Sequence, residues 1–212
     1  MSKYDYDLLV IGSGPGGQSA FGSKAGDTFT VDVVNGNTAG VTGSGTTIAF
    51  SDFENLSGEA GGDVFNMNSG LAGTVDGGIG TDTIVGTATA GNAFVVNDVL
   101  NGDGGTVNGT TFAGVENLTG GAGVDQFTFD AALSGTASGL GNDDVFNIND
   151  NGSAGIIDGG GQATAAGDEV TYAGRVAQAA DVAFDAFTDI ETLTGSTLAT
   201  DTLRGTAAPV YD

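Results

Sequence analysis

Short apolar runs separated by Gly, Asn and Asp occupy the chain from about residue 22 onward. Runs such as 28–31 and 127–129 are rich in Phe, Thr and Val, which are typical of strands. The Gly and Asn between them supply the positive φ that tight turns require. We therefore predict short strands near residues 28–33, 47–50, 63–67, 82–86, 93–97, 110–113, 125–129, 144–148, 168–172, 182–184 and 201–203. Residues 176–187 instead show a spacing that favours a short helix or an insertion.

The apolar runs belong to a longer unit that recurs. The stretch FSDFENLSG at 50–58 returns as FAGVENLTG at 112–120 and as FTDIETLTG at 187–195. Residues 50–84 match residues 112–146 without a gap. Such recurrence indicates one structural unit stacked on itself, and we interpret the repeated stretch as a corner of that unit.

Strands of three to five residues cannot bury an apolar face alone, but copies stacked in register can. We therefore predict an all-β fold, a right-handed parallel β-helix or β-solenoid, in which Asn55 and Asn117 form ladders with neighbouring coils. A β-sandwich is the alternative, although its strands would alternate more strictly. The expected domains are a leader at 1–21 and a solenoid at 22–212, with repeats near 26–90 and 91–165 and a partial repeat at 166–212.

The first twenty residues differ from the rest. YDYDLLVIGSGPGG runs an apolar segment into G-x-G-x-x-G, formed by Gly12, Gly14 and Gly17. It resembles the N-terminus of flavin-dependent pyridine nucleotide-disulphide oxidoreductases, which implies a helix N-terminus facing the FAD pyrophosphate. The helical period, the second strand ending in Glu and the redox Cys pair of that family are absent. We expect no bound flavin or nicotinamide, and we interpret the segment as a leader whose residues 8–11 are recruited as a strand or end cap.

Composition narrows the classes of function. The chain carries 27 acidic and four basic residues, a net charge of −23, which disfavours nucleic acid and anionic membrane surfaces as partners. Divalent cations would screen this charge. The absence of Cys and His removes thiol and imidazole chemistry and most transition-metal sites. No apolar run reaches transmembrane length, so we expect no membrane insertion.

Glycine-aspartate turns are the candidates for binding chemistry. GGIGTDTIV at 77–85 and GGAGVDQFT at 120–128 fit the nonapeptide G-G-x-G-x-D-x-U-x, and looser copies lie at 58–66 and 138–146. They resemble the calcium-binding repeats of secreted RTX proteins, which implies carbonyl and carboxylate ligands for calcium. The candidate ligands are Asp63, Asp82, Asp125 and Asp144. These motifs stand singly rather than in tandem, and the alternative is a structural turn with solvated carboxylates.

The recurrent acids Glu54, Glu116 and Glu191 suggest the paired carboxylates of a glycosidase or lyase. Catalysis needs a unique cleft, whereas these residues occupy equivalent places in each repeat. We therefore expect them to satisfy turn amides, and we expect no enzymatic activity.

Residues 22–212 as a whole resemble the repeat arrays of large bacterial surface and secreted adhesins with RTX-like turns. The resemblance implies an extracellular or cell-surface location and a stalk, matrix or adhesive role. The expected partners are copies of the chain, divalent cations and cell-surface polysaccharide. Our main hypothesis is a self-assembling structural protein, and the alternative is a calcium-binding adhesin or stalk module. Remote alternatives are a flavin- or nicotinamide-binding fragment and a polysaccharide-active β-helix.

Overall fold

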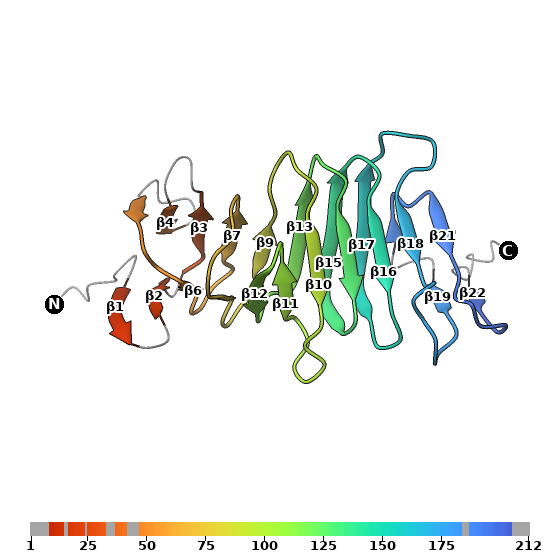
Figure 1. The fold of residues 1–212 in the computed structure, drawn as a ribbon, viewed down its shortest axis with the longest axis horizontal. Helices are drawn as coiled ribbons and strands as arrows, with labels where there is room; N and C mark the ends of the chain where they lie inside the picture. Colours follow the sequence, from red (N-terminus) through yellow and green to blue (C-terminus); the bar gives the residue numbers. More distant parts are fainter. Residues whose placement is uncertain are drawn as a thin grey trace, which may run out of the picture.

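The structure is a computed structural model that describes residues 9–14, 17–23, 25–32, 37–41, 47–183 and 187–204. Within these ranges the protein is all-β, and no helix is present. It is elongated, with two large, mostly parallel sheets that run along its length (Figure 1). This confirms the predicted all-β class.

The first sheet has eleven strands. In spatial order they are β1 (Leu9–Gly14), β2 (Gly17–Phe21), β6 (Asn55–Ser57), β8 (Thr74–Asp76), β12 (Thr110–Ala113), β11 (Gly105–Val107), β10 (Ala93–Val96), β14 (Gln126–Phe129), β16 (Val145–Ile148), β18 (Glu169–Thr171) and β21 (Thr192–Thr194). The second sheet has nine strands: β20 (Phe187–Thr188), β17 (Ser153–Gly161), β15 (Ala132–Gly141), β13 (Asn117–Gly121), β9 (Thr83–Val85), β7 (Val64–Met67), β3 (Asp27–Val31), β4 (Asn37–Val41) and β5 (Ile48–Phe50). Strands β19 (Asp181–Ala183) and β22 (Thr202–Arg204) form a separate parallel pair.

The chain passes from one sheet to the other and back, and we call one such passage a circuit. Strands β6, β7, β8 and β9 alternate between the sheets, and so do β14, β15, β16, β17 and β18. Within each sheet, strands of successive circuits pair in parallel and in register, for example Phe127 with Phe146 and Leu118 with Ala137. Equivalent residues therefore form columns along the molecule.

Antiparallel strands interrupt this pattern at three places. Strand β1 pairs with β2 as a hairpin, and two three-strand meanders are formed by β3, β4, β5 and by β10, β11, β12. Strand β2 then pairs in parallel with β6. The apolar segment of the leader is thus a strand, as expected, but it runs into another strand rather than into the helix that a dinucleotide-binding fold requires.

The core lies between the two sheets and is built from stacked side chains. The rings of Phe94, Phe127 and Phe146 stack at centroid distances of 4.6 and 4.8 Å, and those of Phe29 and Phe65 stack at 5.0 Å. All five side chains are at most 1% exposed. The parallel register imposes this stacking, because it sets identical residues about 4.8 Å apart in adjacent strands.

Three expectations from the sequence need correction. The ENL stretch is not a corner: it forms strands β6 and β13, with Leu56 and Leu118 buried. The longest strands, β15 and β17, lie in Gly- and Ser-rich segments where no strand was predicted. Residues 181–183 form strand β19, and no helix is present in the described part of the 176–187 window.

Candidate functional site

Two columns of mostly acidic side chains run along the corners where the chain crosses between sheets, and their aspartates are buried. The first column contains Asp27, Asp63, Asp82 and Glu116, which precede or begin strands β3, β7, β9 and β13. In each step a carboxylate oxygen accepts a hydrogen bond from the backbone N–H of the acid before it. The N–H groups of Asp27, Asp63 and Asp82 donate to Asp63 Oδ1, Asp82 Oδ1 and Glu116 Oε2 at 2.6, 2.8 and 2.7 Å.

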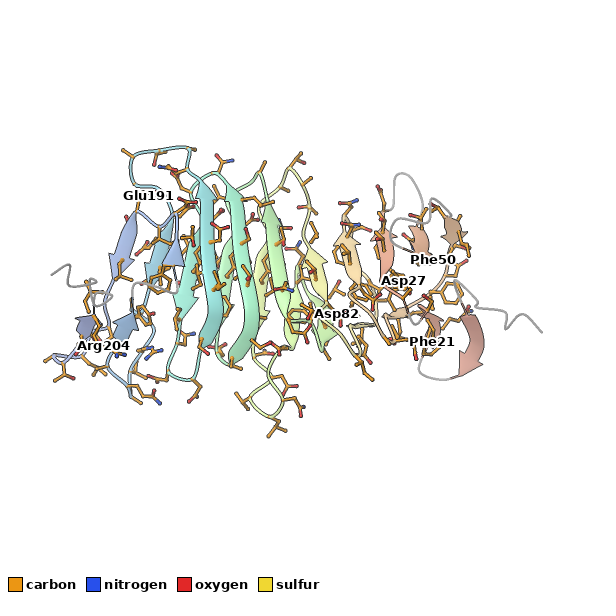
Figure 2. The ribbon with its side chains drawn as sticks, turned by 180° about the vertical axis from the view of Figure 1, so that it is seen from behind. Phe21, Asp27, Phe50, Asp82, Glu191 and Arg204 are labelled. Carbon is orange, nitrogen blue, oxygen red and sulfur yellow. The ribbon has the colours of Figure 1, made fainter. Side chains whose placement is uncertain are left out.

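The second column lies at the opposite corner and repeats the arrangement. It contains Asn92, Asp125, Asp144, Asp168 and Glu191, before β10, β14, β16, β18 and β21. The N–H groups of Asn92, Asp125, Asp144 and Asp168 donate to the next member at 2.6, 2.7, 2.7 and 2.9 Å. Each column therefore connects successive circuits, and each described column ends on a Glu. Figure 2 shows Asp27 and Asp82 of the first column and Glu191 of the second.

The four aspartates predicted from the Gly-Asp turns lie two in each column. Asp63 and Asp82 belong to the first, and Asp125 and Asp144 belong to the second. All four are 0% exposed, so the alternative of solvated carboxylates is wrong. These carboxylates can be buried because each accepts a hydrogen bond from a backbone N–H group in place of one from water.

Other members of the columns were not singled out as binding candidates, namely Asp27, Asn92 and Asp168. Their place in the sequence could have identified these three residues, since each stands one residue before a strand or at the start of a strand. The register also shows that Glu116 of the ENL motif is equivalent to Asp82, because Asn117 pairs with Thr83. The acid of the Gly-Asp motif and the acid of the ENL motif, which the sequence alone does not relate, therefore occupy equivalent positions in the structure.

The second carboxylate oxygen of several aspartates is buried without a hydrogen-bond partner. This holds for Oδ2 of Asp63, Asp82, Asp144 and Asp168. Each lies against a preceding glycine, and a glycine or aspartate carbonyl of the next circuit lies against the same glycine. At Gly139, for example, a Cβ atom would meet both Asp144 Oδ2 and the Gly159 carbonyl oxygen.

Burial raises the pKa of these carboxyls. Loss of hydration is the largest cause and raises the pKa of Asp63 and of Asp144 to about 7, while the amide hydrogen bonds from Asp27 and Asp125 oppose it. Neighbouring carboxylates of the same column raise both values further. The pKa of Asp82 and Asp168 is raised for the same first reason. Asp63 and Asp144 are therefore expected to hold protons at pH values where exposed aspartates are ionised.

The recurrent glutamates bind backbone amides. Glu116 Oε2 accepts from Asp82 N–H, Glu191 Oε2 accepts from Asp168 N–H, and Glu54 Oε2 accepts from Gln18 N–H at 2.5 Å. Because each glutamate stabilises a different circuit, the three do not form a shared pair of acids.

The two asparagines of the ENL motif bridge three circuits. Asn55 Oδ1 accepts from Thr74 N–H at 3.0 Å, and Asn117 Oδ1 accepts from Thr136 N–H at 3.0 Å. Their Nδ2 groups donate to the carbonyls of Gln18 and Asp82 in the circuits before. The ladders predicted for these residues therefore form between side chain and backbone.

Replacing Glu116 with Ala is expected to lower the free energy of unfolding by about 1–3 kcal/mol, because the buried N–H of Asp82 loses its acceptor. Glu116→Gln keeps an oxygen acceptor and should cost less than half as much. Urea denaturation measures both variants. Equal losses for the two would show that charge, rather than the hydrogen bond, is what Glu116 supplies.

Replacing Gly139 with Ala is expected to destabilise the protein by about 1–3 kcal/mol, because the new methyl group overlaps Asp144 Oδ2 and the Gly159 carbonyl oxygen. Gly70→Ala is the matched control, since the nearest atom to its Cβ is Thr110 Oγ1 at 3.8 Å. Thermal denaturation should separate the two variants. A normal melting temperature for Gly139→Ala would contradict the close packing of glycine against the column.

Pockets in the described part of the chain are shallow. One of 340 Å³ is lined by glycines and apolar residues of β9, β13, β15 and the adjoining turns, among them Val85, Ala122 and Leu140. Another of 470 Å³ lies beside the β10–β11 loop and includes Asp98 and Asn101. Neither contains a member of the two columns.

Comparisons with protein-family models, with curated proteins and with solved structures give no match. The described residues contain no cluster of three or more acidic side chains arranged to hold a metal ion. They also contain no helix long and apolar enough to cross a membrane.

Proposed function

We propose that the chain is a non-enzymatic, extracellular structural protein. In this proposal the two sheets form a right-handed parallel β-helix that assembles with copies of itself, end to end or side by side, into a fibre, matrix or surface layer. A cell-surface or secreted location follows from the same role.

The observation that carries the proposal is the use of the acidic side chains. The buried acids of both columns, and the three recurrent glutamates, bind backbone amides of the preceding circuit. Their places are equivalent from circuit to circuit, whereas a catalytic site needs a unique constellation. Acids distributed in this way support a role in holding a repeated stack together.

Unpaired strand edges support assembly. Within the described residues, β5 and β20 are the two end strands of the second sheet, and β21 ends the first. Such edges present free N–H and C=O groups to a further strand. The net charge of −23 opposes side-by-side contact unless cations screen it, so lateral assembly should depend on divalent ions.

Sedimentation velocity and negative-stain electron microscopy over a concentration series test the proposal. We expect elongated particles that lengthen with concentration, and bundles that appear with calcium or magnesium and disperse in chelator. Monodisperse particles of one length at every concentration, with and without divalent ions, would overturn it.

A calcium-binding adhesin or stalk module is the second candidate. It is favoured by the unpartnered Oδ2 atoms of Asp63, Asp82 and Asp144, each beside a glycine that a carbonyl oxygen of the next circuit also contacts. Calcium takes six to eight oxygen ligands, so one ion would draw on neighbouring circuits. In this role Asp63, Asp82, Asp125 and Asp144 are the ligands, and calcium neutralises the buried charge.

Calorimetry with calcium chloride on chelator-treated protein distinguishes the two candidates. A calcium-dependent rise in melting temperature that Asp82→Asn removes would favour the adhesin module. An unchanged melting curve would reject the calcium-binding module and leave the structural protein as the remaining candidate. Cell-surface polysaccharide remains a proposed partner of either form, and a flavin-binding or polysaccharide-cleaving role has weaker support in this geometry.

A further inference from the structure

The repeated stretch places three strands at equivalent positions. Phe50 in β5, Phe112 in β12 and Phe187 in β20 each open one copy of it. The equivalence extends to the hairpins, because β5 pairs antiparallel with β4 as β12 pairs antiparallel with β11. The neighbours of one such strand therefore indicate what the others can bind.

Two of the three strands have a parallel strand on their other side. Phe112 lies opposite Val75 of β8, and Phe187 lies opposite Ile157 of β17. Both partners come from the motif Ala-Gly-x-(Val/Ile)-Asp-Gly-Gly, at 72–78 and 154–160. In both pairings an apolar residue therefore lies opposite the Phe.

Among the described residues, β5 has no such strand. It is the last strand of the second sheet, and β4 is its neighbour on one side. Ile48 is 37% exposed and Ala49 is also exposed, and Phe50 is 8% exposed where Phe112 is 1% exposed. No strand in the described part of the chain occupies beside β5 the position that β8 occupies beside β12.

The backbone groups that would bind a partner can be named. The carbonyl of Ala113 in β12 accepts a hydrogen bond from Gly77 N–H beyond β8 at 3.0 Å. Alternate residues of a strand direct their N–H and C=O groups to the same side, so Thr111 also faces β8. Ala49 and Ser51 are the equivalent residues at β5.

We infer that the free edge of β5 is the docking site for a parallel strand from the C-terminal end of a second copy of this chain. This inference rests on the proposed self-assembly, and it identifies the edge of β5 as the surface through which two copies bind. Strand β20 ends the same sheet at the other end, and the chain of pairings from β3 to β20 is parallel throughout. Two successive antiparallel pairings return β5 to that direction.

A simple translation along the molecule therefore brings the end of one copy beside β5 of the next with parallel strands. Figure 2 shows Phe50 near one end of the molecule and Arg204 near the other. The first sheet does not offer the same continuity, because its end strand β1 runs antiparallel to β2 and so to β6 and β8. The edge of β5 is the one that continues the internal pairing.

Ala49→Pro tests the contact, because proline removes the outward N–H while the pairing of β5 with β4 uses the other side of the strand. We expect Ala49→Pro to melt as the wild type does and to sediment as single particles at concentrations where the wild type elongates. Ala49→Val keeps the N–H and should elongate normally. Thr111→Pro removes the equivalent group where β8 is already bound, and it should lower the melting temperature instead.

A second measurement separates this inference from the proposed function. A synthetic peptide of residues 71–79 is added to single particles, and amide exchange is followed at Ala49 and Ser51. We expect at least about tenfold slower exchange at these two amides, since a paired edge opens less often.

If the wild-type protein elongates and the Ala49→Pro variant elongates equally, the β5 contact is overturned and self-assembly stands. Wild type that never elongates, with peptide protection at Ala49, overturns self-assembly and keeps the edge as a strand-binding site. Absence of both effects overturns both.

Discussion

Replacing Phe127 with Ala is expected to lower the free energy of unfolding by about 3–5 kcal/mol, the largest effect of a single core substitution. Phe127 is 0% exposed and stacks on Phe94 and Phe146 at 4.6 and 4.8 Å. The substitution therefore removes two ring contacts at once, each worth about 0.5–1.5 kcal/mol beyond the burial itself. It also leaves a cavity that the fixed register of the flanking strands cannot close.

Guanidinium denaturation followed by circular dichroism measures this effect. Phe127→Leu, which keeps most of the buried area, should lose less than half as much. Val124→Ala is the surface control, because Val124 is 60% exposed, and it should change stability by less than about 0.5 kcal/mol. A loss for Phe127→Ala no larger than that of the surface control would show that the stacked rings do not hold the circuits together.

The strands that contain Phe, such as β3, β10 and β14, could be predicted from the sequence within a residue or two. Each pairs an inward Phe with outward Thr or Val and is bounded by Gly, Asn or Asp. That alternation is visible in any window of five residues.

Strands β15 and β17 could not be predicted in the same way. They consist largely of Gly, Ala and Ser, residues that disfavour isolated strands. They are strands because β15 pairs with both β13 and β17, and Ala137 and Ile157 continue the stack of buried side chains beyond Leu118. Pairing between circuits, which a local window does not contain, determines these elements.

The candidate site could also be predicted only where a local motif marks it, and not where the pairing between circuits determines it. The Gly-Asp motif selected Asp63, Asp82, Asp125 and Asp144 as candidate calcium ligands, and the structure shows that all four are buried members of the columns, while calcium binding stays a prediction. It could not show that Glu116 shares their column, because the register of β9 and β13 is needed to align them. Nor could it show burial, because aspartates in glycine-rich turns are usually exposed.

The protein is expected to be most stable at about pH 4 and to lose stability as the pH rises from there to about 7, where the loss levels off. In the folded state the pKa of Asp63 and of Asp144 is raised to about 7, mainly by burial, whereas the unfolded chain should show values near 3.8. Between these values the folded state holds protons that the unfolded state has released, so unfolding becomes easier as pH increases. Each such proton contributes about 1.4 kcal/mol per pH unit to the slope.

Exposed aspartates set the acid limit of this range. Hydrogen bonds from Thr164 and from the 176–178 amides lower the pKa of Asp143 and of Asp150. Their stabilisation is present above their ordinary pKa and is lost as the pH falls toward the lowered one. The maximum should therefore lie at about pH 4, and urea denaturation in chelator across about pH 3 to 9 measures it.

The substitution Asp144→Asn tests whether the fall in stability with rising pH arises from the buried carboxylates of the columns. Asparagine keeps an oxygen to accept from Asp125 N–H, and its amide group can donate to the Gly159 carbonyl that lies beside Oδ2. An asparagine already occupies the equivalent position at Asn92, where its Oδ1 accepts from Thr87 N–H and its Nδ2 donates to Asp125 Oδ1. We expect Asp144→Asn to be more stable than the wild type above about pH 7, to match it at about pH 4, and to show a shallower dependence on pH.

Asp143→Asn is the matched control, with the same change of charge one residue away. Its carboxylate accepts from Ala163 N–H, Thr164 N–H and Thr164 Oγ1, so its neutralisation should lower stability at pH 7 rather than raise it. Opposite signs at adjacent positions would separate the buried column from the general repulsion of an acidic chain, which both substitutions reduce equally. Wild-type stability that stays level or rises from pH 5 to 8 in chelator would mean that the columns ionise without cost, and the protonated state inferred from their burial would be wrong.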